Sequence, residues 1–305
     1  MRVQVIVNPF AGNGRAGKLW PQVERRLREI YPDVQLRLTS RPGEATEISR
    51  QSIADGVDLI FAMGGDGTVN EVVNGFFENE APLTSHTALG CIPIGTGADF
   101  VRSLNLPRDP LHAIQKISTA VPRLVDVGKL RCASHDGQPV VRYFINVADL
   151  GIGGAVVDRI NGSSKRLGGF LTHLNSLVVT LVSYENVRVH LRIDDAIDEE
   201  MVVNSINIAN GQFLGGGMWL APEAKIDDGW FDIVIIGNLN RAEALMNIPR
   251  LYRGRLALHP KVKVVRGRRV EVTSTQEVLL DADGEAPGKL PAVFEILPSA
   301  VKLLA

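Results

Sequence analysis

The chain has 305 residues, of which 45% are hydrophobic and 22% are charged, and its formal net charge is -1. A globular chain of this length buries roughly three quarters of its unfolded surface, which is enough for two domains with their own cores. The balanced charge gives no indication of a basic surface for nucleic acid. Cys91 and Cys132 lie too far apart for a metal-ligand motif, and two such cysteines fit a reducing cytoplasm best.

Strands and helices alternate in the first part of the chain. Val3–Val7 is predicted to be a strand, and after the loop Asn8–Gly17 apolar residues recur at helical spacing over Leu19–Ile30. A second strand, Val34–Leu38, and a second helix, Glu44–Ala54, follow. This alternation predicts an open, mostly parallel, Rossmann-like sheet.

The run Gly64-Gly65-Asp66-Gly67-Thr68 lies between the apolar strand Val57–Ala62 and a helix predicted over Val72–Phe77. Glycines let backbone N–H groups converge on an anion, and the start of a helix adds the favourable end of its dipole. A carboxylate beside a phosphate needs a cation or a proton between them, so Asp66 favours a metal-nucleotide. The alternative is a plain strand-to-helix turn in which Asp66 is the N-cap.

A further glycine-rich loop, Gly95–Phe100, follows a strand predicted over Ala88–Ile94. Parallel strands joined by right-handed crossovers end on one edge of the sheet, where open α/β folds bind ligands. Glycine-rich loops after three such strands therefore predict a nucleotide site.

The pattern changes after about Val121, and the domain boundary is predicted between Pro122 and Asp126. Period-two alternation then indicates antiparallel strands. The predicted strands are Val187–Ile193, Val202–Ala209, Phe231–Ile236, Lys261–Val265 and Arg269–Thr273. Helices are predicted over Phe170–Tyr184 and Arg241–Tyr252, and the first is too short and polar to span a membrane. We therefore expect an α/β nucleotide-binding domain over residues 1–122 and a mostly antiparallel, sandwich-like β domain over 123–296, with residues 297–305 packing back on the first domain.

Four motifs occur in one order along the chain. They are Asn8-Pro9 with Gly12-Asn13-Gly14, the Gly64–Thr68 run with Asn70-Glu71, the loop Gly95–Phe100, and Leu280-Asp281-Ala282-Asp283-Gly284-Glu285. Together they resemble the diacylglycerol kinase catalytic-domain family, which includes bacterial lipid kinases and, more distantly, sphingosine and ceramide kinases. The Gly-Gly-Asp-Gly-Thr run alone also resembles NAD kinases, from which the Asn-Pro opening and the late Asp-Gly-Glu separate this chain.

This resemblance implies an ATP- and Mg²⁺-dependent lipid kinase whose active site lies in the cleft between the two domains. Asp66 and Asp99 would organise the catalytic Mg²⁺, and Glu285 would accept the proton of the lipid hydroxyl. From its residues alone, Glu285 also fits an exposed side chain after an Asp-Gly hairpin turn. The implied nucleotide-binding residues are Asn8, Thr39, Gly64, Gly65, Asp66, Gly67, Thr68, Asn70, Glu71, Gly95 and Thr96.

The resemblance also implies a second Mg²⁺ site. Asp228 would supply the carboxylate, Lys225 and Trp230 their backbone carbonyls, and Asp126 a contact through water. Read without the resemblance, the same segment fits an Asp-Gly turn between strands equally well. The chain departs from the family pattern at Ala98, where asparagine is usual, so one amide donor and acceptor is absent.

The implied partner is a lipid substrate, and the composition indicates no nucleic-acid partner. Oligomeric state is left open, with a homodimer among the alternatives. A basic stretch without acidic residues, Arg250–Arg269, and the smaller pair Lys165-Arg166 fit peripheral contact with an anionic membrane on its cytoplasmic face, or a solvated strand face. Two other functions stay open: a kinase of a soluble acceptor such as NAD, and a nucleotide-binding regulator without catalysis.

Overall fold

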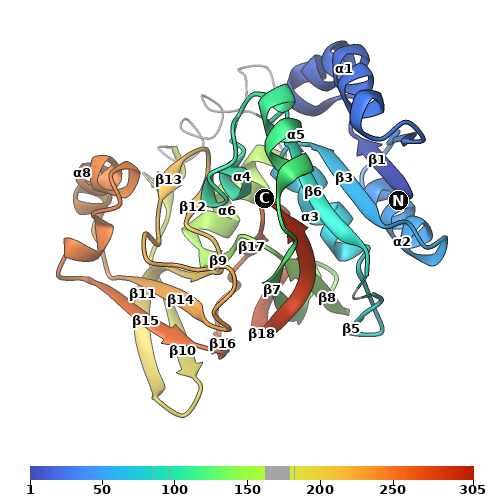
Figure 1. Cartoon of the computed structure of the whole chain (residues 1–305). Helices are drawn as coiled ribbons and strands as arrows, with labels where there is room; N and C mark the ends of the chain where they lie inside the picture. The colour runs from blue at the N-terminus through green and yellow to red at the C-terminus, as the bar shows by residue number, and fades with distance from the viewer. Residues whose placement is uncertain (85, 96, 162–178, 182) are drawn as a thin grey trace. The chain divides into compact units, whose positions relative to one another are not determined.

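The computed structural model describes residues 1–84, 86–95, 97–161, 179–181 and 183–305. The chain divides into two compact units, one formed by Met1–Asp126 with Ser299–Ala305 and the other by Val127–Pro298. The last strand, β18 (Lys289–Leu304), begins in the second unit and ends in the first. Figure 1 shows this strand in red.

A parallel sheet forms the centre of the first unit. Its strands, in spatial order, are β2 (Gln35–Leu38), β1 (Val3–Val7), β3 (Leu59–Gly64), β6 (Ala88–Pro93) and the end of β18. Each neighbouring pair is parallel. All residues of β1, β3 and β6 are buried, as is usual for parallel strands covered by helices on both faces. The predicted open parallel sheet is confirmed.

Helices connect and cover these strands. They are α1 (Ala11–Ile30), α2 (Glu44–Ala54), α3 (Asp66–Asn74), α4 (Asp99–Ser103) and α5 (Pro110–Thr119), with α1 packed on α5 and α2 on α3. Residues 12–14 have left-handed φ values, so regular helix in α1 begins after Gly14. The prediction of a helix over Val72–Phe77 was wrong at both ends. Helix α3 begins at Asp66, and Phe77 lies in the short strand β4 (Phe77–Glu78), which pairs with β5 (Ala81–Pro82).

Antiparallel strands form most of the second unit, as predicted. The main order is β15 (Val262–Gly267), β14 (Phe231–Gly237), β11 (Ile197–Ala209), β10 (Val187–Ile193), β16 (Arg269–Thr273) and β18. The strand β9 (Val147–Gly151) lies between β11 and β17 (Leu280–Ala282), and β7 (Arg123–Ala133) pairs with β8 (Pro139–Phe144) and β18. A separate hairpin joins β12 (Phe213–Leu214) to β13 (Met218–Trp219).

Aromatic and branched side chains fill the core of the second unit. The rings of Phe144 and Phe231 stack at 5.6 Å between centroids, and Phe294 meets Phe144 edge-on at 6.4 Å. All three rings are fully buried. Such inward-facing residues alternate with outward-facing polar ones along β10, which accounts for the period-two pattern in the sequence.

The helices of the second unit are α6 (Ile152–Asn161), α8 (Arg241–Tyr252) and the short 3-10 helix η1 (Leu256–Leu258). The predicted helix Arg241–Tyr252 is confirmed. Most of the predicted helix Phe170–Tyr184, and the pair Lys165-Arg166, lie outside the described residues. No helix in the described part of the chain is long and apolar enough to cross a bilayer.

Candidate active site

The loops that follow β1, β3 and β6 meet at one edge of the parallel sheet. A Cβ atom added to Gly95, after β6, would lie 2.8 Å from Gly65 Cα, after β3. A Cβ atom added to Gly12, after β1, would lie 2.6 Å from the carbonyl oxygen of Ile94. Because real Cβ contacts are longer than this, the close approach of these three loops requires glycine at Gly95 and Gly12.

The Gly64–Thr68 run leads directly from the last residue of β3 into the first turn of helix α3. Gly65 is the N-cap, so the N–H groups of Asp66, Gly67 and Thr68 lie in the first helical turn, where they have no carbonyl of the same helix to bind. Asn8 Nδ2 donates to Thr68 Oγ1 at 3.3 Å and ties the loop after β1 to this turn. The first turn of α3 is therefore suited to an anion such as a phosphate.

Asp66 joins the start of α3 to the start of α4. Its Oδ2 accepts from the backbone N–H of Asp99 and its Oδ1 from that of Phe100, both at 3.1 Å. The structure thus brings together the two aspartates expected to organise Mg²⁺. Asp99 is buried, with Oδ1 3.9 Å from Arg102 Nε. Two carboxylates beside an anion site repel each other and the anion, and a divalent cation relieves this repulsion, so the residues fit Mg²⁺.

Cys91 lies on β6 near this site, and its thiol could act as a nucleophile there only if it were ionised. Burial raises the pKa of the Cys91 thiol to about 12, and the negative charge of Asp66 adds to the increase. The thiol is therefore neutral at physiological pH, which leaves no reactive cysteine at this edge.

Three other expected nucleotide residues form hydrogen bonds inside the first unit. Glu71 Oε2 accepts from the N–H of Ala45 at 3.1 Å, which joins α3 to the start of α2. Asn70 Oδ1 accepts from Asn74 Nδ2 at 3.1 Å within α3. Thr39 is buried at the end of β2, and its N–H donates to the carbonyl of Val7. Thr96, also expected at the nucleotide, lies outside the described residues.

Ala98 adopts a left-handed conformation, with φ 47° and ψ 47°, as the N-cap of α4. Asparagine tolerates this region better than alanine does, because its short amide forms local hydrogen bonds there. The departure from the family pattern therefore removes an amide and leaves the less suitable residue in the same backbone conformation.

Glu285 lies in the second unit, directly after a two-residue hairpin turn. Its N–H donates to the carbonyl of Ala282 at 3.0 Å, and the N–H of Ala282 donates back at 2.9 Å. Asp283 and Gly284 form the turn with φ values of 53° and 90°, as a type I′ turn requires. The side chain of Glu285 is exposed, so both the turn and an accessible carboxylate are present.

Two aspartates inside the second unit fix this turn. The carboxylate of Asp283 accepts from three consecutive backbone N–H groups, at Ile145, Asn146 and Val147, over 2.8 to 3.0 Å. Asp281 Oδ1 accepts from the N–H of Gly284 at 2.7 Å. The position of Glu285 is thus set by hydrogen bonds from the backbone to these two buried side chains.

A carboxyl pair lies behind this turn and was missed in the sequence. Asp149 on β9 and Asp281 on β17 are directly opposite in the antiparallel register, and both are buried. A Cβ atom on Gly153 would lie 1.9 Å from Asp149 Oδ1, so glycine leaves room for the carboxyl group. The sequence alone could not reveal this pair, because only the register of β9 and β17 places the two aspartates opposite each other.

Burial raises the pKa of Asp149 to about 7 and raises that of Asp281 well above its usual range, where the charge of Asp149 adds to the effect. The two carboxyl groups come from directly opposed residues and are buried, so they would repel each other if both were charged. We therefore expect the pair to hold one proton at neutral pH.

The residues expected at a second Mg²⁺ site fall in different units. Asp126 is in the first, where its Oδ1 accepts from the N–H of Ser299 at 2.7 Å. In the second unit, Asp228 Oδ1 accepts from the N–H of Trp230, and Asp228 Oδ2 forms an ion pair with Arg266. Lys225 is exposed, and the described residues contain no metal-binding group of three or more His, Cys, Asp or Glu side chains. Arg266 already pairs with the Asp228 carboxylate, so a cation there would share this carboxylate with the guanidinium.

Comparisons with known proteins agree over nearly the whole chain. The family model described as "Diacylglycerol kinase catalytic domain" matches residues 2–130, and the model "YegS C-terminal NAD kinase beta sandwich-like domain" matches residues 146–305. The curated "Diacylglycerol kinase" of Bacillus subtilis (strain 168) is 31% identical over 295 residues, which cover 96% of this chain and 92% of the relative.

Solved structures show the same relationship. The crystal structure of a diacylglycerol kinase from Bacillus anthracis str. Sterne matches with a TM-score of 0.73 at 25% identity, covering 99% of this chain and 96% of that one. An NAD kinase from Archaeoglobus fulgidus in complex with ATP matches with a TM-score of 0.51 at 15% identity, covering 100% of this chain and 94% of that one. At 15% identity the likeness concerns the fold alone.

Proposed function

The chain belongs to the diacylglycerol kinase family, and from this premise we propose that it transfers the γ-phosphoryl group of ATP to the hydroxyl group of a diacylglycerol-like lipid, with Mg²⁺. One observation carries the proposal. Three features meet at one edge of the sheet: the close contact of Gly65 with Gly95, the first turn of α3, and the pair Asp66 and Asp99. Together they combine a site for an anion with a site for a cation.

The donor half of the proposed reaction lies in the first unit. N–H groups at the start of α3 bind phosphate oxygens, and the hydrogen bond from Asn8 to Thr68 keeps the neighbouring loop in place. Asp66 and Asp99 would hold the Mg²⁺, which neutralises charge on the phosphoryl oxygens when bound. Asp66 also accepts from the backbone of α4, so it sets the position of Asp99 relative to α3.

The acceptor half lies in the second unit. An exposed carboxylate on a rigid turn is suited to take a proton from a hydroxyl group that approaches within about 2.6–3.2 Å. Asp281 and Asp283 bind the backbone of this turn and its neighbours, so Glu285 needs little reorganisation. We propose Glu285 as the general base.

The second Mg²⁺ site stays a prediction of the family resemblance. A cation at Asp228, with the carbonyls of Lys225 and Trp230 and water-mediated contact to Asp126, would share the Asp228 carboxylate with Arg266. No step of the proposed reaction depends on this site. We place the activity in a reducing compartment, at the cytoplasmic face of a membrane, and both cysteines are buried free thiols in agreement with this.

The proposal is tested by incubating the purified protein with labelled ATP, Mg²⁺ and one acceptor at a time. The acceptors are diacylglycerol, phosphatidylglycerol, a sphingoid base, ceramide and NAD. We expect label in the diacylglycerol product. Transfer to NAD alone would reject the lipid acceptor, and ATP binding without any transfer would indicate a regulator.

Glu285→Gln tests the base in the same assay. Glutamine preserves the shape of the side chain but does not accept a proton, so kcat should fall by about 10²- to 10⁴-fold. The dissociation constant of ATP should not change, because Glu285 lies outside the proposed nucleotide site. Undiminished transfer by the Glu285→Gln protein would rule out Glu285 as the base.

A further inference from the structure

Helix α8 exposes large apolar side chains on one face. Leu245 and Met246 are 36% and 70% exposed, whereas Ala244 and Asn247 on the opposite face are buried. Leu258 of the neighbouring η1, which packs against α8, is 76% exposed. Exposed apolar residues are ordinary when they occur singly, but a cluster on one helix and its neighbour marks a surface for interaction.

Exposed arginines lie on α8 and in the segment that joins it to η1, namely Arg241, Arg250, Arg253 and Arg255. Arg241 lies one turn before Leu245 on α8, and Arg250 lies one turn after Met246. Within the described residues, no ion pair involves these arginines. The surface of α8 and η1 therefore combines an apolar centre with unbalanced positive charge.

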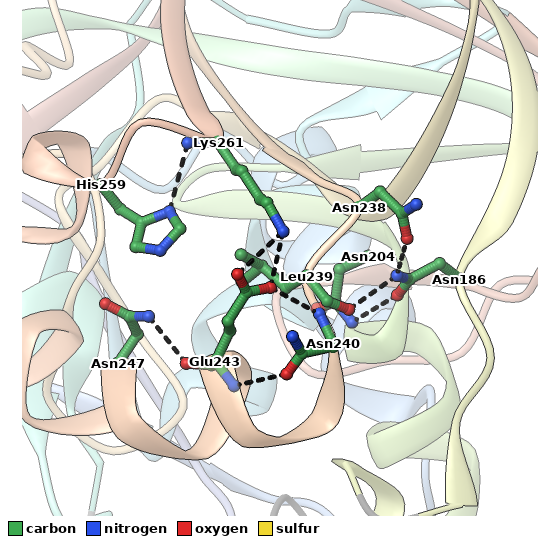
Figure 2. Close-up of polar contacts among 9 residues, drawn as sticks. All are labelled: Asn186, Asn204, Asn238, Leu239, Asn240, Glu243, Asn247, His259 and Lys261. Carbon is green, nitrogen blue, oxygen red and sulfur yellow. Dashed lines mark hydrogen bonds and ion pairs between the residues drawn. The ribbon is translucent and has the colours of Figure 1, made fainter.

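The one acidic residue of α8 is neutralised. Both carboxylate oxygens of Glu243 accept from Lys261 Nζ, at 2.8 and 2.7 Å (Figure 2). The sequence contains no other acidic residue between Glu243 and Glu271. No negative charge in this stretch opposes an anionic partner.

Basic residues farther along the predicted membrane-binding stretch are already engaged elsewhere. Lys263 lies 3.9 Å from Glu199, Arg266 pairs with Asp228, and the guanidinium of Arg268 lies 4.3 Å from the ring centre of Trp230. The structure thus divides the stretch. Among the described residues, the arginines of α8 and of the segment after it have no acidic partner, and Arg250 donates only to the neutral Asn247, at 3.1 Å.

A polar network fixes the start of α8 on the sheet of its unit. Asn240 and Glu243 form a capping box, each side chain accepting from the backbone N–H of the other residue at 2.8 to 2.9 Å. Asn186 Nδ2 donates to Asn238 Oδ1 and to the carbonyl of Leu239 at 2.6 and 2.7 Å, just before the helix (Figure 2). The helix is preformed, so a partner need not order it on binding.

We propose that α8 and η1 form the surface by which this protein docks on an anionic lipid bilayer. Leu245, Met246 and Leu258 enter the boundary between headgroups and acyl chains, and the arginines bind lipid phosphates. Preformed helices with an apolar face and basic flanks bind membranes in this way, and opposite charge selects anionic lipid. The inference rests on the proposed function, since a kinase of bilayer lipids must work at the bilayer surface.

The test is flotation of the protein with vesicles of phosphatidylcholine, with and without phosphatidylglycerol. We expect binding to the anionic vesicles that weakens as salt is raised. In Arg250→Ala/Arg253→Ala, affinity should fall about fivefold for each arginine removed. Met246→Ser/Leu258→Ser should lose the part of vesicle binding that does not depend on salt, because that part comes from the apolar side chains. Arg37→Ala and Leu38→Ser, which remove an exposed arginine and a 54% exposed leucine from the first unit, are matched controls and should bind like the original protein.

Undiminished vesicle binding by both α8 variants, or no binding by the original protein, would overturn the proposal. A dimer in light scattering that dissociates in Met246→Ser would also overturn it, since the surface would then contact a second copy of the chain. All the substituted side chains are exposed, and unfolding curves check that each variant is folded.

A separate assay with dispersed short-chain diacylglycerol distinguishes docking from catalysis. The α8 variants should keep their kcat there, because that substrate needs no bilayer. If the original protein phosphorylates no lipid yet floats with anionic vesicles through α8, the proposed function fails while the docking surface stands.

Discussion

Single residues at the candidate site depend on backbone conformation as much as on chemistry. Glu285 was visible in the sequence as part of an Asp-Gly-Glu motif, yet the structure shows that the neighbouring Asp283 binds three backbone N–H groups. Losing that carboxylate would leave three buried donors without an acceptor, which is costly. The motif therefore combines one exposed carboxylate suited to chemistry with one buried carboxylate that positions it.

The Asp149–Asp281 pair predicts a pH dependence of stability. Burial raises the pKa of Asp149 from 3.8 to about 7, so the folded protein keeps a proton that the unfolded chain releases at lower pH. The stabilisation from this proton is full below about pH 4 and is lost as the pH rises toward 7. Asp149→Asn has no proton to lose at this position. Its free energy of unfolding, relative to that of the original protein, should therefore increase as the pH rises from about 4 to 7.

Urea unfolding at a series of pH values measures this difference. The control is Asp33→Asn, which changes an exposed carboxylate in the first unit. A difference between Asp149→Asn and the original protein that stays constant with pH would show that the pair does not hold the proton.

At the scale of elements, the nucleotide site depends on how closely three loops approach. The sequence located the loops by their glycines and the parallel order of the strands. It placed the helix after Gly64–Thr68 too late, because the first turn of α3 contains few apolar residues and so lacks helical periodicity. The close contact of Gly65 with Gly95 is a tertiary feature that no local pattern records.

Gly95→Ala tests this contact. The new Cβ would lie 2.8 Å from Gly65 Cα, so the two loops must separate, with a loss of about 1–3 kcal/mol in the free energy of unfolding. ATP should also bind more weakly, because the N–H groups of the two loops would move apart. Urea unfolding and calorimetric titration with ATP measure the two effects.

Gly65→Ala is the matched variant from the other side of the same contact. Its Cβ would lie 3.6 Å from Gly95 Cα, an ordinary van der Waals distance, so the loss of stability should be smaller. Equal losses for the two variants would contradict this account of the contact.

At the scale of the whole molecule, the two ends of the chain complete one unit. The last residues of β18 pair in parallel with β6, and Ser299 is bound by Asp126 where the chain first leaves that unit. Val301 and Leu303 are buried, at 1% and 0% exposure. The parallel sheet therefore depends on residues from the far end of the sequence.

Leu303→Ala should reveal this dependence. It removes a fully buried side chain and leaves a cavity, so the free energy of unfolding should fall by about 2–5 kcal/mol. The neighbouring Lys302→Ala removes one hydrogen bond, from Lys302 Nζ to the carbonyl of His86, and should cost less than about 1 kcal/mol. Similar losses for both would mean that β18 adds little to the sheet.

The sequence by itself determined the order of the elements, the change from parallel to antiparallel strands and the motifs that resemble the kinase family. These features are local, because the spacing of apolar residues in strands and helices and the composition of glycine-rich loops depend only on neighbouring residues in the chain. The tertiary structure decided three other features: the roles of Asp149, Asp281 and Asp283, the pairing of Asp228 with Arg266, and the arginine-rich surface of α8. Each depends on contacts between residues distant in the chain, and strand register and burial, which set those contacts, are properties of the folded molecule.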